Sequence, residues 1–390
     1  MKPSAYYRGK EQTYVKHFFL EQYLETVAFH IGYTHKEFVY VDCFSGPWRA
    51  DDEELADTSI RIALDRLNYV RDGLAKQGRA PNIRAVFVEK SPTAFAALEH
   101  ALVQHRHFIT TVAFPGTFEE NIPRILDAVG AAFAFYFIDP KGWTGFDMDD
   151  IRPILLHQPG EVMVNFMYDF INRFLNFPSP ANEASLDRCF GTTRWREIRD
   201  DPDREAASVG LYMEQLRRTG QFTYVTSTRI LKPLHDRAYF HLIYATRNPK
   251  GIIKFRDVEK RVVAAQDHVR NDAQRDNREQ RSGQTELHFG EPLTPSDTVQ
   301  AARSAKLKKA AAKIDELLRP GPLPYEVLQP LILELPLVWN TDLNKILVDK
   351  QKQGLIIIDG LGPRERTPKQ GCTIRRTTNT LYPSDTEDLR

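Results

Sequence analysis

FVYVDCFSGPW, residues 38–48, is the stretch that decides the fold. Its first half has the length and composition of a buried strand, and this apolar run ends in Asp42. A turn that contains Gly46 follows at once. A buried strand that ends in a carboxylate and a glycine turn is the usual way for an α/β sheet to bring backbone amides and one acid to a nucleoside-like ligand. The stretch therefore predicts a ligand site at the end of this strand.

Two further strands in the same half of the chain also end in acids. AVFVEK, residues 85–90, reaches Glu89, and FAFYFIDPKGW, residues 133–143, turns at Asp139. Ligands of open parallel sheets bind beyond the carboxyl ends of the strands. We therefore expect Asp42, Glu89 and Asp139 to lie around one site.

Strand-like and helix-like patterns alternate through this half of the chain. Apolar spacing predicts helices at about 10–29, 51–77, 91–102, 122–129 and 149–156, which alternate with strands at 38–42, 84–89, 108–114, 133–139 and 161–167. Such alternation predicts the α/β class, with a doubly wound, mostly parallel Rossmann-like sheet covered by helices on both faces.

The remainder of the chain predicts additions to that sheet. Two β-rich runs, 222–231 and 239–247, are close enough for an antiparallel pair at one sheet edge, and an inserted helical segment is expected at about 172–220. We expect an α/β domain over 1–256, then a charged helix and linker over 257–298. Three helical segments and a β-hairpin predict a winged-helix-like domain over 299–390, in which basic residues outnumber acidic ones.

Composition limits the possible environments. The chain has 390 residues, is 42% hydrophobic and has a net charge of +1, so any affinity for nucleic acid must come from local patches. Its three cysteines are far apart in sequence, which favours a reducing cytoplasm over a disulfide framework. No apolar run approaches the roughly 20 residues that a membrane span needs, so we expect no membrane contact.

The turn after the first strand favours one cofactor class over another. A nicotinamide cofactor needs GxGxxG, whereas DCFSGPW offers only Gly46. S-adenosylmethionine needs a carboxylate near its amino group, a close backbone turn, and an acid at the end of the second strand for its ribose. Asp42, Phe44, Gly46 and Glu89 are accordingly the predicted cofactor-binding residues, and no metal is expected.

The step from Asp139 to Pro140 is the sharper chemical signal. It fixes the backbone so that the carboxylate and the following carbonyl can accept hydrogen bonds from an exocyclic amine. Trp143 could stack on a planar base, and Lys141 could pair with a phosphate. We take Asp139, Pro140 and Trp143 as the catalytic candidates.

The next strand adds substrate-binding candidates. In VMVNFMYDF, residues 162–170, Asn165 ends the strand, and Tyr168 and the nearby Arg173 could face the same crevice. With Lys141 they form the predicted substrate-binding set. A competing interpretation makes this segment a helix that packs its phenylalanines on the sheet, with Asn165 as its cap.

Together these segments resemble the class I S-adenosylmethionine-dependent methyltransferases, and more specifically the three-Cys-motif partner (TcmP) family. The resemblance runs through KEQTYVKHFFLEQYL, VDCFSGPW, FVEKS, FYFIDPKGW, EVMVNFMYDFINRF and AYFHLIYATRNPKGI. It implies a methyltransferase-type sheet and a protein partner with a three-cysteine motif, similar to radical S-adenosylmethionine enzymes. DPKGW also resembles the DPFG element of tRNA guanine dimethyltransferases, which implies that Asp139 and Pro140 lie at a target nitrogen.

Three functions remain open at this point. The first is a methyltransferase acting on an exocyclic amine of a nucleic-acid base, together with its three-cysteine partner. The second is a non-catalytic binding partner with the same fold, favoured by Pro47 and Trp48 in the turn and by Lys141 where an aromatic residue is expected. The third is a nucleic-acid-binding regulator that uses the winged-helix-like domain on DNA or RNA.

Overall fold

The computed structural model describes residues 7–46, 58–105, 109–177, 179–283 and 297–377. Pro47, Trp48 and the first part of the helix expected at 51–77 lie outside the described residues. The chain divides into two compact units, Met1–Thr298 and Val299–Arg390. Each unit is described by itself.

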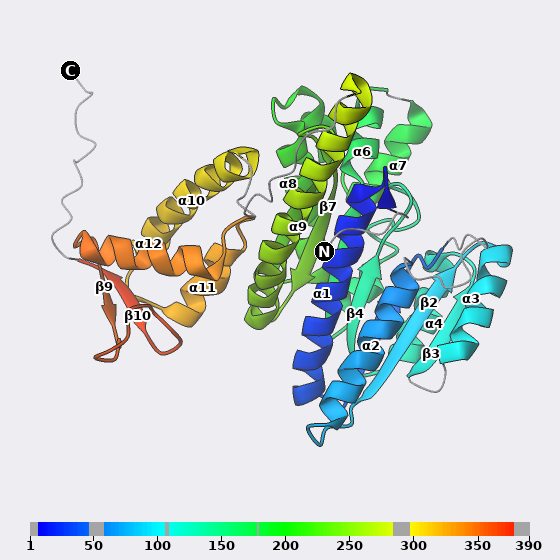
Figure 1. Ribbon diagram of the computed structural model, residues 1–390, viewed down its shortest axis with the longest axis horizontal. Coiled ribbons are helices and arrows are strands. Elements are labelled where there is room, and N and C mark those ends of the chain that lie inside the picture. The colour runs from blue at the N-terminus through cyan, green and yellow to red at the C-terminus, as the bar shows by residue number, and fades with distance from the viewer. Residues whose placement is uncertain (1–6, 47–57, 106–108, 178, 284–296, 378–390) are drawn as a thin grey trace. The chain divides into compact units, whose positions relative to one another are not determined.

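A seven-stranded sheet organises the first unit (Figure 1). Its strand order is β3-β2-β1-β4-β5-β7-β6, in which β1 to β5 are parallel and β7 is antiparallel to both of its neighbours. The expected doubly wound, Rossmann-like sheet with an antiparallel pair at one edge is confirmed. The strands are β1 Glu37–Asp42, β2 Asn82–Glu89, β3 Thr110–Pro115, β4 Phe133–Ile138, β5 Gly160–Phe166, β6 Tyr224–Leu231 and β7 Ala238–Thr246.

The strand order places a switch point between β1 and β4. From β1 the chain winds outward to β2 and β3, then returns to the other side of β1 to form β4 and β5. Crevices for ligands form at the carboxyl ends of strands where the winding reverses in this way. Asp42 is the last residue of β1, and Asp139 directly follows β4, so both acids lie at this switch point.

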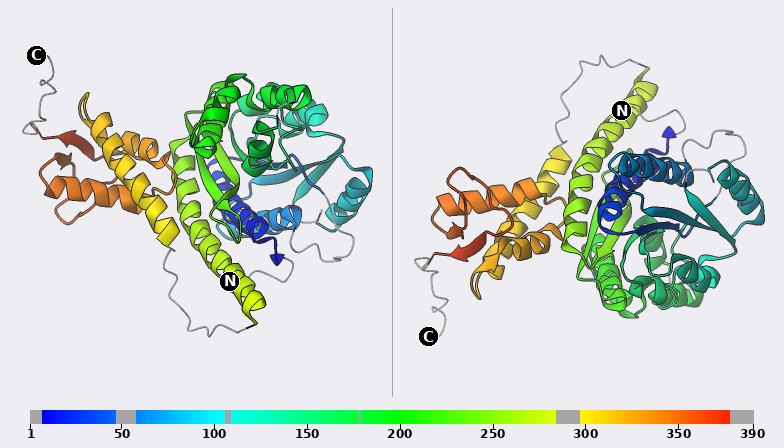
Figure 2. Two further views of the ribbon diagram at one scale, coloured as in Figure 1. Left: turned by 90° about the horizontal axis from the view of Figure 1, so that it is seen from above. Right: turned by 90° about the horizontal axis from the view of Figure 1, so that it is seen from below.

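β4 is apolar at every position, and β5 is buried at every position after its first, because helices cover both faces of the sheet (Figure 2). On one face α1 packs beside α2 and α9, and on the other α4, α5, α7 and α8 share a core with β1, β4 and β5. The helices are α1 Glu11–Thr34, α2 Ser59–Ala75, α3 Pro92–His105, α4 Phe118–Val129, α5 Arg152–Leu156, α6 Tyr168–Leu175, α7 Pro180–Phe190, α8 Arg204–Gly220 and α9 Pro249–Ser282.

Local signals explain where several helices begin. Thr117 and Glu120 form a capping box at the start of α4, and the Thr58 hydroxyl accepts a hydrogen bond from a backbone amide at the start of α2. Asn248 caps α9, and Pro249 occupies its first turn. This cap starts the helix eight residues before the charged segment expected at 257, so the charged residues extend a helix that packs on α1 and β6.

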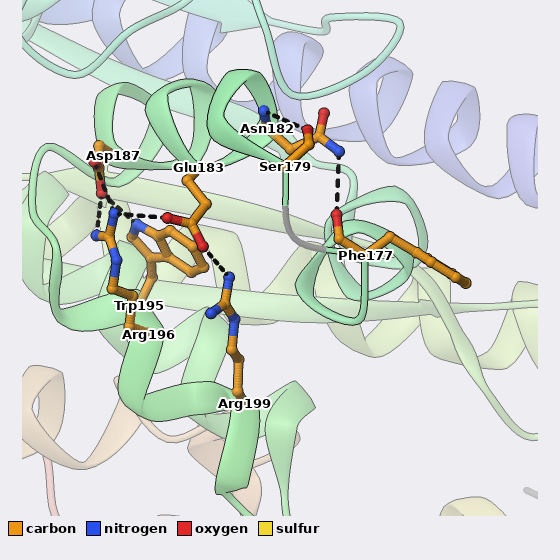
Figure 3. A network of polar contacts seen from close by, with 8 residues as sticks. All are labelled: Phe177, Ser179, Asn182, Glu183, Asp187, Trp195, Arg196 and Arg199. Carbon is orange, nitrogen blue, oxygen red and sulfur yellow. Dashed lines mark hydrogen bonds and ion pairs between the residues drawn. The ribbon is translucent and has the colours of Figure 1, made fainter.

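The insertion between β5 and β6 is held together around one tryptophan (Figure 3). Trp195 is fully buried and donates its indole N–H to Asp187 Oδ1 at 2.7 Å. The guanidinium groups of Arg196 and Arg199 lie 4.6 and 4.9 Å from its ring centroid, and they also pair with Asp187 and Glu183 respectively. The predicted helical segment is therefore a packed subdomain made of α7, the 3₁₀ helix Arg194–Asp200 and α8.

A buried polar cluster joins α1 to strands β5 and β7. Glu161 is 4% exposed, and its carboxylate accepts hydrogen bonds from the Tyr23 hydroxyl at 2.8 Å and from Thr246 Oγ1 at 3.1 Å. The Tyr23 hydroxyl also lies 2.7 Å from that of Tyr244. Burial raises the pKa of Glu161, and the three hydroxyl partners oppose that rise. Such a cluster is stable only while every member is satisfied.

We expect Gly251→Ala to destabilise the first unit through this cluster. A Cβ at Gly251 would lie 2.3 Å from the Tyr244 hydroxyl and 2.6 Å from Glu161 Oε1. Overpacking of this kind costs about 1–3 kcal/mol. The matched control is Gly210→Ala in α8, where nothing lies within 4 Å of the added Cβ. That change should stabilise the protein by about 0.5–1 kcal/mol through helix propensity. Urea unfolding of both variants measures the difference, and equal stabilities would contradict the packing described for Gly251.

The described residues of the second unit, up to residue 377, form three helices and a small sheet. Its elements follow the order α10 Asp297–Leu317, β8 Leu323–Pro324, α11 Tyr325–Leu333, α12 Asn340–Lys352, β9 Ile356–Asp359 and β10 Thr373–Arg376. The sheet is antiparallel, with β10 between β8 and β9. A separate apolar core, which includes Ile314, Leu328, Leu347 and Ile374, packs the helices on this sheet.

Candidate functional site

A cavity of about 710 Å³ opens at the carboxyl ends of β1, β2 and β4. Its walls include residues predicted for the site together with parts of α1, α2 and α4, and its volume falls in the range of small-molecule sites. The predicted site residues that line it are Phe44, Gly46, Glu89, Asp139, Pro140, Lys141 and Asn165.

The turn after β1 is fixed against the end of β2. Ser45 N donates to Val88 O at 2.8 Å, and the Ser45 hydroxyl accepts from Val88 N at 3.1 Å. These bonds hold Gly46 against Glu89, so that a Cβ on Gly46 would lie 1.7 Å from Glu89 Oε2. A side chain at this position would require the Glu89 carboxylate to move, because the carboxylate occupies its space.

Glu89 is directed into this corner by its own backbone partner. Its Oε1 accepts a hydrogen bond from Ser91 N at 2.6 Å, and the residue is 7% exposed. Phe44 forms the adjoining wall, with its ring 5.4 Å from that of Phe118. A carboxylate, a bare glycine backbone and an aromatic ring thus meet at one end of the cavity.

Asp42 lies beneath the cavity and is not part of its lining. It is fully buried, its Oδ1 accepts from Phe44 N at 3.2 Å, and its Oδ2 accepts from the Ser59 hydroxyl at 3.3 Å. Asp42 therefore braces the turn and the start of α2, a supporting position that differs from the direct cofactor contact expected from the sequence. Burial, reinforced by the charge of Asp139, raises the pKa of Asp42 to about 7.

This raised pKa predicts a specific pH dependence of stability. The folded protein retains a proton on Asp42 between its ordinary pKa of 3.8 and about 7, whereas the unfolded chain releases it. The contribution of Asp42 to the free energy of unfolding is therefore fully present below about pH 4 and is lost as the pH rises toward 7. Three pKa units correspond to about 4 kcal/mol.

Asp42→Asn should remove that loss, so its stability relative to wild type should rise by about 4 kcal/mol between pH 4 and pH 8. Wild type alone would not isolate this effect. Burial lowers the pKa of His17 to about 3, so the contribution of His17 to the free energy of unfolding increases as the pH rises. The difference between variant and wild type removes that contribution. Urea unfolding of both proteins across this range measures the difference. A difference independent of pH would show that Asp42 titrates normally.

Asp139 is engaged by two partners, of which only Asn165 was predicted to lie in the same crevice. Lys16, from α1, forms an ion pair with Asp139 Oδ2, and Asn165 donates its side-chain amide to Asp139 Oδ1 at 2.6 Å. Lys16 is 123 residues away in sequence and was not among the predicted site residues. Its only sequence signal was a place on an amphipathic helix near the first strand.

Asn165 presents a free acceptor. It is 2% exposed and lines the cavity, and its Oδ1 has no hydrogen-bond partner within the described residues. Because the amide nitrogen faces the Asp139 carboxylate, the orientation of the Asn165 amide is fixed. A buried acceptor without a donor is costly, and a ligand N–H would satisfy it.

Three predicted residues lie elsewhere. Trp143 donates its indole N–H to Ser185 Oγ at 2.9 Å and packs 4.1 Å from Phe174, so it faces the insertion and is not part of the cavity lining. Tyr168 is buried beside His241. Arg173 lines a second cavity. Trp143 packs on the apolar surface of the insertion and therefore points away from the cavity. Its position in the loop sequence does not show this direction.

Other candidate chemistries find no support in the described part of the chain. No group of three or more His, Cys, Asp or Glu residues is placed there to hold a metal. Cys43 is buried, and burial raises the pKa of its thiol, so it lacks the properties of a nucleophile. No helix within the described ranges is both long and apolar enough to cross a membrane.

No family model and no curated protein sequence matches the chain. Among solved structures, it is similar to cofactor-bound Rv0187 from MTB, at 12% identity and a TM-score of 0.31, over 58% of this chain and 79% of that one. It is also similar to a loganic acid methyltransferase with SAH, at 11% identity and a TM-score of 0.30, over 72% of this chain and 92% of that one. Similarity at this level does not identify a function, which must be inferred from the residues of the cavity.

Proposed function

We propose that the protein is an S-adenosylmethionine-dependent methyltransferase that acts on an exocyclic amine of a nucleic-acid base. The observation that carries this proposal is the contact between Gly46 and Glu89 at the wall of the cavity. A carboxylate at the end of the second strand suits the two ribose hydroxyls, and the adjoining glycine leaves the space that this carboxylate occupies. Phe44 supplies an apolar wall beside it.

The other end of the cavity suits an amine. S-adenosylmethionine would supply an electrophilic methyl group there. The free Asn165 Oδ1 and the Asp139 carboxylate offer acceptors for the two amine protons, and the buried Pro140 limits where a substrate can lie. Acceptors for both protons hold the nitrogen lone pair toward the methyl group, and such positioning supplies much of the rate acceleration in a displacement reaction.

The second unit supports a nucleic-acid substrate. Its order of helix, strand, helix, helix, strand, strand supports the proposal of a winged helix, in which α12 would be the recognition helix. Lys345 and Lys352 are exposed on α12, whereas Lys350 pairs with Asp315 at 2.7 Å and Arg375 with Asp359 at 2.7 Å. We propose that this unit binds DNA or RNA through exposed basic side chains such as those of Lys345 and Lys352. Duplex binding by the full chain that does not weaken with salt would contradict this role.

The resemblance in sequence leads us to propose a protein partner with a three-cysteine motif. The test of the whole proposal is mass spectrometry of total nucleosides from cells with and without the protein, followed by methyl transfer to the indicated nucleic acid by the purified chain, alone and with its partner. We expect a methylated nucleoside that is missing from cells without the gene and that the purified chain forms in the assay. Unchanged nucleosides would contradict the proposed substrate class.

A non-catalytic binding partner is the second candidate, and one observation favours it. Lys16 and Asn165 already engage both oxygens of Asp139, which leaves that carboxylate less free for an amine. This candidate predicts that the complex recovered from the native host transfers no methyl group to nucleic acid, although the chain still binds its three-cysteine partner.

A further inference from the structure

A second cavity, of about 440 Å³, borders the first. The start of α1, α6, the turn between β6 and β7, and α9 form its walls, and Tyr239 lines both cavities. Arg173, predicted from the sequence to bind substrate, lies here. Because Tyr239 lines both, the two cavities lie next to each other.

Two hydrogen-bond acceptors in this cavity lack donors. Glu11 Oε1 accepts from Gly9 N at 2.8 Å, but Glu11 Oε2 and Gln12 Oε1 are buried without a partner within the described residues. Both residues line the cavity. Buried acceptors are normally satisfied, so this wall suits a ligand that brings N–H groups.

Positively charged hydrogen-bond donors also line this cavity. Arg173 is 62% exposed at its side chain and contacts Asp169 through one nitrogen at 3.0 Å, which leaves other guanidinium donors available. Arg8 and Lys232 also line the cavity. Guanidinium groups bind phosphate through paired N–H donors. Tyr239 adds an aromatic face, above which Lys232 Nζ lies 5.8 Å from the ring centroid.

We propose that this cavity binds the nucleotide next to the methylated one, an inference that rests on the proposed function. Its base brings an exocyclic amine to Glu11 and Gln12, its ring faces Tyr239, and its phosphate lies near Arg173 and Arg8. A nucleotide combines N–H donors, a planar ring and an anion. A basic peptide would be repelled by the positive charge of Arg8 and Arg173, and an acidic peptide would be repelled by the carboxylate of Glu11.

The test compares AMP with IMP, which has a carbonyl in place of the amine, by calorimetry on the full chain with saturating S-adenosylhomocysteine. One added hydrogen bond should make AMP bind about tenfold more tightly than IMP. Glu11→Gln keeps the acceptor for Gly9 and turns the other oxygen into a donor, so it should abolish or invert this preference. Arg173→Ala should weaken AMP about tenfold or more but leave adenosine unchanged.

The matched control is Arg61→Ala, which removes an Arg–Asp pair of the same i,i+4 spacing on α2. It should leave AMP binding intact. The inference is overturned if AMP does not bind, if AMP and IMP bind equally, or if a lysine- and arginine-rich peptide binds in place of AMP. Failure of the proposed function gives a different result, namely no binding of S-adenosylhomocysteine. In that case the AMP titrations can be carried out without S-adenosylhomocysteine.

Discussion

Gly46→Ala is expected to abolish measurable binding of S-adenosylmethionine. The new Cβ would lie 1.7 Å from Glu89 Oε2 and 2.7 Å from its Cδ, so the carboxylate must move. That movement breaks the bond from Ser91 N to Glu89 Oε1 and removes the acceptor proposed for the ribose. Hydrogen bonds to a charged group contribute about 1.5–3 kcal/mol each, so losing two predicts a Kd at least about 100-fold higher.

The control for this change lies in the same cavity. Gly142→Ala adds the same methyl group where nothing lies within 4 Å, and it should bind the cofactor like wild type. The double variant Gly46→Ala with Glu89→Asp shortens the obstructing side chain and should recover part of the affinity. Cofactor binding by Gly46→Ala equal to that of Gly142→Ala would mean that the ligand does not use this corner.

Asp139→Asn is expected to lower kcat for methyl transfer by about 100-fold or more, with the cofactor Kd changed only a few-fold. The substitution keeps the shape of the side chain but removes the charge that pairs with Lys16. It also leaves a single acceptor oxygen, so Lys16 and the Asn165 amide compete for it and the free acceptor at Asn165 is held less firmly toward the substrate. The assay is single-turnover methyl transfer to the nucleic acid identified by nucleoside mass spectrometry.

A second measurement on the same variant does not depend on a substrate. The charge of Asp139 contributes to the raised pKa of Asp42, so Asp139→Asn should lower the Asp42 pKa from about 7. Asp65→Asn, which removes an exposed ion pair on α2, is the matched control and should change neither quantity. Unchanged kcat in Asp139→Asn would remove Asp139 from the reaction, and an unchanged pKa would mean that the two acids do not interact.

The sheet could be predicted from the sequence because its strands carry their own signals. FAFYFI is apolar at every position and FVYVD at every position but its last, Asp42, which is typical of strands covered on both faces, and glycine or proline turns bound them. The start of α4 was not predicted: apolar spacing placed it at 122, whereas the Thr117 side chain caps the helix at Phe118. The early start of α9 required recognising Asn248 and Pro249 as a cap after a strand.

The candidate site was only partly predictable. Glu89 and Asp139 follow from their positions at strand ends, since parallel topology brings such ends together. Lys16 could not be found this way, because no local pattern says which turn of α1 reaches the end of β4. The direction of Trp143 depends on Phe174 and Ser185, residues of a segment that folds onto the loop from elsewhere in the chain.

Asp42 illustrates a different limit of sequence reasoning. An acid at the end of the first strand can contact a ligand or support the turn beneath it, and both roles give the same sequence pattern. The structure distinguishes them through burial and through the bonds from Phe44 N and the Ser59 hydroxyl. Its effect on a ligand is thus exerted through the position of the turn.

Calorimetric titration of the purified full chain with S-adenosylmethionine tests the central claim most directly. We expect saturable binding at one site per chain, retained in Gly142→Ala and lost in Gly46→Ala. The absence of saturable heat at concentrations up to about 1 mM, with or without the three-cysteine partner, would contradict the claim that the cavity beside Gly46 and Glu89 is a methyl-donor site.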